Sequence, residues 1–253
     1  VDKSLEAIFP DHEVRIRDWS DDLTRFLFTV SSDKDPGASY LFDLSKGKVS
    51  KVSESAPWIK NYQLADIEPF TYTSRDGLKL HGYITLPPNY EEGTQIPFIV
   101  HPHGGPNARD YWGYNPEVQF YATRGYGVIQ MDYRGSTGYG RKEMILANHQ
   151  MGKKMQEDKY DALMWANEQG YVDMDNVCIS GASYGGYAAM HAATKAPDLF
   201  KCIITYVGTF DLTSMDLRGL QWSDLGMPME YIEKGNPRDP EDYKNLYDNS
   251  PIF

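Results

Sequence analysis

The sequence has few cysteines, fewer basic than acidic residues, and no long apolar run. Its two cysteines, Cys178 and Cys202, fall in predicted buried strands. We interpret them as small core residues and not as a disulfide framework, which favours a reducing compartment. The 25 basic and 36 acidic residues give a net charge of −11. This balance argues against nucleic acid and anionic membranes as partners, because both are bound by basic patches. No segment approaches the roughly 18 apolar residues of a transmembrane helix.

Residues 1–66 are predicted to form short strands joined by polar turns. The predicted strands are 14–18, 26–32, 39–43 and 48–52. Four such strands in about 40 residues match one blade of a β-propeller. Because one blade cannot bury both of its faces, the pattern implies neighbouring blades. A small β-appendage packed on the main domain is the alternative.

From residue 67 to residue 253 the pattern changes to alternating strands and helices. The predicted strands are 70–72, 78–86, 96–100, 127–131, 177–179 and 202–207, and the predicted helices are 118–123, 155–169 and one after residue 183. For the helix 155–169 we expect one stripe formed by Tyr160, Leu163, Met164 and Asn167. The alternation predicts an α/β fold with a mostly parallel sheet and flanking helices. Ligands of such sheets bind beyond the carboxyl ends of the strands.

The segment 181–186, with the sequence GASYGG, lies between a predicted strand and a predicted helix. A G-x-S-x-G motif in this context is typical of the nucleophile elbow of α/β-hydrolases. It predicts that Ser183 is a nucleophile, held in a strained backbone conformation with its hydroxyl exposed. The N–H of Tyr184 is then expected to donate to a developing oxyanion. The alternative is a glycine-rich turn that contains a serine.

The loop 101–106, with the sequence HPHGGP, follows the predicted strand 96–100. Glycines in such a loop let the backbone approach a substrate oxygen, so Gly105 is the candidate second oxyanion donor. His101 and His103 form a possible metal pair, but no third ligand is near in the sequence. We favour a His103 that braces the loop by hydrogen bonding, and we expect no metal or other cofactor.

No obvious general base accompanies Ser183. His191 is the one histidine after it, and on the predicted helix it lies roughly 12 Å away, so we expect it to pack or to face solvent. His103 precedes the serine, against the Ser, Asp, His order of this fold. Asp211 is a candidate acid, although a turn or helix N-cap residue is the favoured interpretation.

Arg134 has two interpretations that the sequence leaves open. Its guanidinium is suited to binding a carboxylate or a backbone carbonyl of a peptide substrate. Alternatively it forms a structural ion pair, for instance with Asp132 or Asp158.

Several motifs together resemble the prolyl oligopeptidase family of serine peptidases. They are GASYGGY (181–187), HPHGGP (101–106), DYRGSTGYG (132–140), TSRDGLKLHGYITLP (73–87) and NSPIF (249–253). The HGGP form resembles the acylaminoacyl-peptidase branch more than the dipeptidyl-peptidase branch. The resemblance implies an α/β-hydrolase domain capped by a β-propeller that admits short peptides. It also implies Ser183 as nucleophile, and the N–H groups of Gly105 and Tyr184 as oxyanion donors. The aspartate and histidine that it implies beyond the SPI segment are not in this sequence.

We therefore expect a serine peptidase that hydrolyses short peptides through an acyl-enzyme on Ser183. The chain is expected to be part of a longer protein, with an α/β-hydrolase fold incomplete at its C-terminus, and to be nearly inactive alone. A carboxylesterase and a non-catalytic binding module on the same fold are the alternatives. The incomplete sheet predicts an exposed apolar edge, and with it poor solubility or a homo-oligomer.

Overall fold

The computed structural model describes residue 5, residues 7–214 and residues 234–253. The chain divides into two compact units. The first unit comprises Val1–Glu68, Thr85–Tyr90 and Tyr111–Gly125, and the second comprises Pro69–Ile84, Glu91–Asp110 and Tyr126–Phe253.

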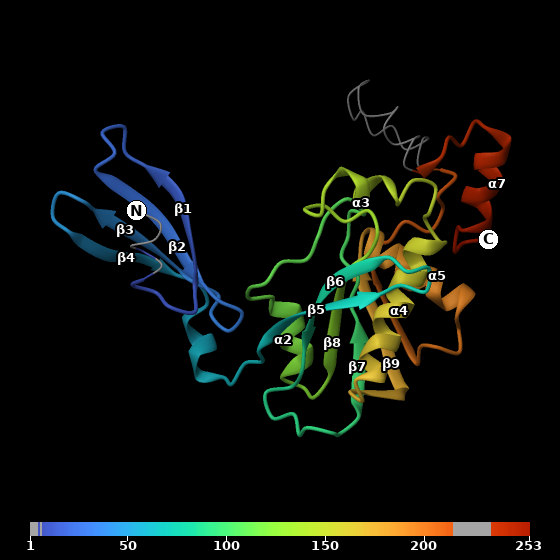
Figure 1. Cartoon of the computed structure of the whole chain (residues 1–253), viewed down its shortest axis with the longest axis horizontal. Coiled ribbons are helices and arrows are strands. Elements are labelled where there is room, and N and C mark those ends of the chain that lie inside the picture. The colour runs from blue at the N-terminus through green and yellow to red at the C-terminus, as the bar shows by residue number, and fades with distance from the viewer. Residues whose placement is uncertain (1–4, 6, 215–233) are drawn as a thin grey trace. The chain divides into compact units, whose positions relative to one another are not determined.

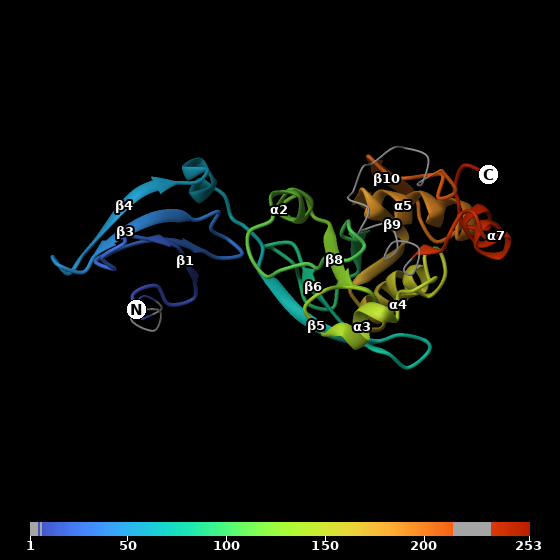
Figure 2. The ribbon, with the colours of Figure 1, turned by 90° about the horizontal axis from the view of Figure 1, so that it is seen from above.

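The first unit contains a four-stranded antiparallel sheet in the order β1-β2-β3-β4 (Figures 1 and 2). Its strands are β1 (Glu13–Trp19), β2 (Arg25–Ser31), β3 (Ala38–Asp43) and β4 (Lys48–Glu54). A small apolar cluster is built on Leu5, Phe28 and Val30. Large side chains such as Trp19 and Val52 remain exposed. The four short strands expected from the sequence are confirmed.

The same unit contains η1 (Pro57–Asn61) and α2 (Pro116–Ala122). The side chain of Asn115 caps α2, because its oxygen accepts the N–H groups of the first helical turn. Gln119 on α2 is buried, and its side-chain amide links this helix to two other segments of the first unit. It donates to the carbonyl oxygens of Asp33 and Ala65 and accepts the N–H of Ala65.

The second unit is built on a six-stranded sheet in the order β10-β9-β7-β8-β6-β5. The strands are β5 (Ile67–Thr73), β6 (Lys79–Thr85), β7 (Ile96–Val100), β8 (Gly127–Asp132), β9 (Val172–Ala182) and β10 (Cys202–Tyr206). Four of them, β10, β9, β7 and β8, pair in parallel. All six residues of β8 are buried, as expected for a central parallel strand covered on both faces.

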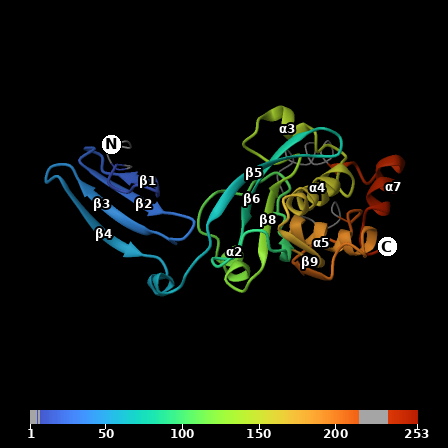
Figure 3. The ribbon, with the colours of Figure 1, turned by 60° about the horizontal axis from the view of Figure 1, so that its bottom comes forward.

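The helices that the structure describes in this unit are α3 (Arg141–Ile145), α4 (Lys154–Glu168), α5 (Tyr184–Lys195) and α7 (Pro240–Asp248). Helices α4 and α5 lie side by side (Figure 3), and the amide of Gln156 donates to the carbonyl of Ala188 at 3.0 Å. None of the described helices is long and apolar enough to cross a membrane.

The stripe expected on α4 is wrong in its phase. Of its four predicted members only Leu163 is buried, whereas Tyr160, Met164 and Asn167 are partly exposed. The buried residues are Met155, Gln156, Asp158, Lys159, Ala162, Leu163 and Ala166. The buried face of α4 thus includes alanines and charged residues. The larger side chains of Tyr160 and Met164, which suggested the predicted stripe, lie beside this face.

Strand β10 forms one edge of the sheet, and Tyr206 on it is 70% exposed. Cys178 on β9 and Cys202 on β10 are register partners, and both are free thiols. Both are only half-buried rather than core residues, because β10 has no neighbour on its outer side among the described strands. Self-association through this edge stays a prediction.

Candidate active site

Ser183 lies at the sharp turn between β9 and α5. Its backbone has φ 56° and ψ −119°, a left-handed conformation that non-glycine residues rarely adopt. Its N–H donates to the carbonyl of Tyr206 at 2.9 Å, which ties the turn to β10. The residue is exposed. These are the backbone strain and the exposure that the sequence predicts for a nucleophile elbow.

Two glycines make this turn possible because other backbone atoms come very close to them. A Cβ added at Gly181 would lie 2.5 Å from the carbonyl carbon of Gly185. A Cβ added at Gly185 would lie 2.2 Å from the carbonyl oxygen of Pro102. Real Cβ atoms essentially never approach this closely, so the elbow and the loop 101–106 require glycine where they meet.

The loop 101–106 packs directly against the elbow. A Cβ added at Gly104 would lie 3.3 Å from the Cβ of Ser183 and 3.8 Å from its Oγ. A ring nitrogen of His101, Nδ1, lies 2.9 Å from the carbonyl oxygen of Ser180 and fixes the loop to β9. The structure therefore brings together the two segments that carry the candidate oxyanion donors, Gly105 and Tyr184. The role of their N–H groups stays a prediction.

His103 braces this loop by hydrogen bonding, as expected. Its Nδ1 donates to the carbonyl of Gly104 at 2.7 Å, and its Nε2 lies 3.0 Å from the hydroxyl of Ser136. The ring stacks on Tyr133 at a centroid distance of 4.3 Å. Burial lowers the pKa of His103 to about 4, so the imidazole is neutral near pH 7. Since its nitrogens are engaged away from Ser183, His103 is a brace and not the general base.

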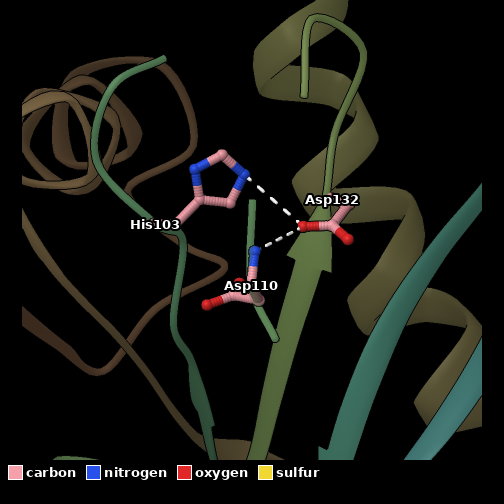
Figure 4. A group of neighbouring side chains, drawn as sticks. All are labelled: His103, Asp110 and Asp132. Carbon is pink, nitrogen blue, oxygen red and sulfur yellow. Dashed lines mark hydrogen bonds and ion pairs between the residues drawn. The ribbon is translucent and has the colours of Figure 1, made fainter. Parts of the chain in front are cut away.

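His103 also lies beside two carboxylates, Asp110 and Asp132 (Figure 4). One potential ligand atom of each residue lies within 4.8 Å of the other two. Asp132 accepts the N–H of Asp110 at 2.8 Å and the hydroxyl of Tyr139 at 2.5 Å. Burial, and then the charge of Asp132, raise the pKa of Asp110 to about 7. One imidazole and two carboxylates could hold a divalent cation, but the metal pair considered for His101 and His103 is not formed.

The other candidate bases are also accounted for. His191 is 2% exposed, and its Nε2 lies 3.4 Å from the side-chain oxygen of Asn249, so it packs as expected. Asp211 accepts the N–H groups of Thr213 and Ser214 at 2.9 and 3.2 Å, which confirms its interpretation as a turn residue. Within the described residues, none of these groups is hydrogen-bonded to the hydroxyl of Ser183.

Arg134 is held in a buried ion-pair network, which is the structural one of its two interpretations. It is 4% exposed, and its guanidinium donates to both carboxylate oxygens of Asp158 at 2.7 and 2.8 Å. It also donates to both oxygens of Asp76, each at 2.9 Å. Of the two expected partners, Asp158 is correct and Asp132 is wrong. Four bonds to two carboxylates therefore engage the guanidinium.

The comparisons with known proteins agree with this geometry. The sequence profile of the prolyl oligopeptidase family matches residues 112–252. The chain belongs to this family. A dipeptidyl aminopeptidase BIII of Pseudoxanthomonas mexicana is 34% identical over 99% of the chain and 37% of its own length. Dipeptidyl peptidase family member 6 of Caenorhabditis elegans is 30% identical over 96% of the chain and 36% of its own length. The chain thus spans little more than a third of these relatives.

Solved structures lead to the same conclusion. An acylaminoacyl peptidase of Pyrococcus horikoshii matches 96% of this chain and 38% of its own length, with 26% identity and a TM-score of 0.77. The expected fold class, an α/β-hydrolase fold preceded by a propeller-like sheet, is therefore confirmed. Prolyl oligopeptidase family members are serine peptidases, and the relatives of this chain include both acylaminoacyl and dipeptidyl peptidases.

Two residues of the second unit were not singled out from the sequence. Asp76 pairs with Arg134, and this pairing joins residues far apart in the chain. Lys159 is fully buried on α4. Its spacing from Met155 and Ala162 follows the helical period, and this spacing is the signal that could have revealed it.

Proposed function

We propose that the protein carrying this chain is a serine peptidase that hydrolyses short peptides through an acyl-enzyme on Ser183. The observation that carries the proposal is the strained, exposed Ser183 packed against the loop of Gly104 and Gly105. We further propose that residues 1–66 end a β-propeller and that residues 67–253 form part of the catalytic domain. The acylaminoacyl and dipeptidyl names of the relatives support short peptides as the substrate class.

In the proposed reaction the hydroxyl of Ser183 attacks the peptide carbonyl while a base removes its proton. The carbonyl oxygen becomes an oxyanion, and the N–H groups of Gly105 and Tyr184 donate to it. The intermediate then collapses, the amine leaves with the proton, and water hydrolyses the acyl-enzyme by the reverse sequence. The base is a histidine oriented by an aspartate, both outside the described residues. A carboxylesterase would use the same steps on an ester.

Labelling with a fluorophosphonate tests this proposal on the protein at its full natural length. We expect one labelled serine, Ser183, and a loss of peptide hydrolysis of at least about 10³-fold in Ser183→Ala. Ser45→Ala, at an exposed turn serine of the first unit, is the matched control and should label normally. Residues 1–253 alone should label far more slowly than the whole protein.

An unlabelled but folded full-length protein would overturn the proposal and favour a binding module. Turnover of peptide anilides and short-chain esters then separates a peptidase from a carboxylesterase. A preference for esters with no measurable peptide hydrolysis would favour the carboxylesterase.

A further inference from the structure

Lys159 is a charged side chain in an apolar place. It is completely buried on α4, and its ammonium donates to the carbonyl of Met155 at 2.6 Å. Lysine is almost never fully buried, because removing an ammonium from water is very unfavourable unless other groups compensate. Among the contacts of this ammonium are the faces of two aromatic rings. The Nζ lies 3.6 Å from the ring centroid of Tyr133 and 5.1 Å from that of Tyr184.

These two tyrosines belong to the two halves of the candidate oxyanion hole. Tyr133 donates its hydroxyl to the carbonyl of His103 at 2.9 Å and stacks on the His103 ring, directly before Gly104 and Gly105. Tyr184 directly follows Ser183, and its own N–H is the other candidate donor. The two tyrosine rings also contact each other, with centroids 5.5 Å apart. Lys159 therefore contacts one tyrosine on each side of the candidate oxyanion hole: Tyr133 beside the loop 101–106, and Tyr184 beside Ser183.

We propose that Lys159 is a positioning residue of the oxyanion hole, a role that rests on the proposed function. Its ammonium attracts the electron-rich faces of Tyr133 and Tyr184 and so fixes both rings relative to each other. Tyr133 transmits this constraint to the loop of His103, and Tyr184 transmits it to its own backbone N–H. The N–H groups of Gly105 and Tyr184 must both point at one oxygen atom, so their positions relative to each other have to be fixed.

A purely space-filling role does not account for the charge. An apolar side chain of similar length, such as methionine, would fill the same volume without a desolvation penalty. The charged groups around Lys159 are Asp158, which favours the ammonium, and Arg134, which disfavours it. Two histidines also lie near enough to interact with this charge. The ammonium of Lys159 contributes to lowering the pKa of His103 and of His191, and both rings are neutral near pH 7. Burial is the largest influence and lowers the pKa of Lys159 to about 7.

The experiment compares Lys159→Met with wild type in the full-length protein. We expect the thermal midpoint to rise by several degrees, because a buried charge is removed. We expect kcat and the rate of fluorophosphonate labelling of Ser183 to fall about tenfold, with KM nearly unchanged. If Lys159 only stabilised the fold, Lys159→Met would have a lower thermal midpoint than wild type, with unchanged kcat and an unchanged labelling rate.

The pH profile gives a second readout. The wild-type labelling rate should rise as the catalytic base loses its proton and then decline above about pH 7 as Lys159 loses its charge. Lys159→Met should keep the rise and lack the decline.

Two control variants lie on the same helix. Lys154→Met removes a charge from the half-exposed Lys154 and should leave the labelling rate unchanged. Leu163→Ala removes a fully buried apolar side chain and should lower the midpoint without slowing the reaction at temperatures well below it.

The outcomes separate this inference from the proposed function. If wild type does not label, the proposed function fails. If wild type labels and Lys159→Met labels and turns over at the wild-type rate at every pH, the positioning role is overturned. Lys159→Leu serves as a second variant if the methionine variant does not fold. If neither folds, the wild-type profile decides, and a flat rate above pH 7 overturns the inference.

Discussion

The two sheets of this chain bury their strands to very different extents. Every residue of β3 in the first unit is only half-buried, whereas every residue of β8 in the second is buried. The antiparallel sheet of β1–β4 packs one small cluster, so much of its surface meets water. The sheet of the second unit is mostly parallel, and such sheets are covered on both faces.

The ion pairs follow the same division. The ion pair of Arg15 and Glu13 in the first unit is well exposed. The second unit buries the pair of Arg134 and Asp158, and it also contains the left-handed Ser183. A buried ion pair and the strained candidate nucleophile thus lie together in the second unit, as is common where function requires a fixed geometry. Similar substitutions should therefore have unequal effects in the two units.

Substitution of a glycine by alanine in each unit should give the largest difference in stability between the two units. Gly185→Ala should destabilise the second unit by about 4 kcal/mol or more and abolish labelling of Ser183, because the new Cβ meets the Pro102 carbonyl oxygen. Gly47→Ala in the first unit should be destabilising by only about 1 kcal/mol. Its φ is +57° but nothing lies within 4 Å of the added Cβ.

Denaturant unfolding and fluorophosphonate labelling measure both variants. Normal labelling by Gly185→Ala would mean that the elbow and the loop 101–106 are not packed as described here. A loss as large in Gly47→Ala would remove the distinction between the units.

The ion pairs give the next largest contrast. Arg134→Met should lower the free energy of unfolding by about 3–4 kcal/mol, since it leaves the buried carboxylate of Asp158 without its partner. Arg15→Met should lower it by less than about 1 kcal/mol, because that pair is exposed.

Urea unfolding at two salt concentrations tests both values. The small effect of Arg15→Met should shrink further at high salt, whereas the effect of Arg134→Met should persist because buried charges are poorly screened. Equal losses in the two variants would contradict the assignment of Arg134 to a buried network.

The ten strands and the helices α2, α4 and α5 were predicted from sequence because each has a local signal, whereas η1, α3 and α7 were not predicted. Polar turn sequences between short strands mark β1–β4, and the glycines around Ser183, between a strand and a helix, indicate a nucleophile elbow. The meeting of the loop 101–106 with this elbow was also predictable, because parallel strands end at the same edge of the sheet.

What the sequence could not supply were pairings between distant segments. Arg134 bonds to Asp76, 58 residues away, and no local pattern connects them. The prediction of which face of α4 is buried was wrong for a related reason. Its buried face includes Lys159 and small alanines, which apolar periodicity ranks below Tyr160 and Met164, so only packing against α5 and the sheet decides it.

The pH dependence of stability gives the smallest of these contrasts. Burial lowers the pKa of His191 in the second unit to about 4, below the value near 6.5 of an unfolded chain. Below pH 6.5 the unfolded chain therefore binds a proton that the native protein does not, and stability is lost as the pH falls toward 4. Between pH 7.5 and pH 5 this loss amounts to about 2 kcal/mol. His191→Leu should remove it, so the variant gains on wild type as the pH falls.

The matched variant in the first unit is Phe28→Leu, at a fully buried position with no ionisable group. It should lower stability by about 1 kcal/mol, and by the same amount at pH 7.5 and at pH 5. Urea unfolding at the two pH values measures both variants. If His191→Leu shifts the two curves equally, as Phe28→Leu should, then His191 is not the source of acid sensitivity. The cost of burying titratable groups in the second unit would then lie with other residues, of which His103 is the next to examine because its pKa is lowered by the same cause.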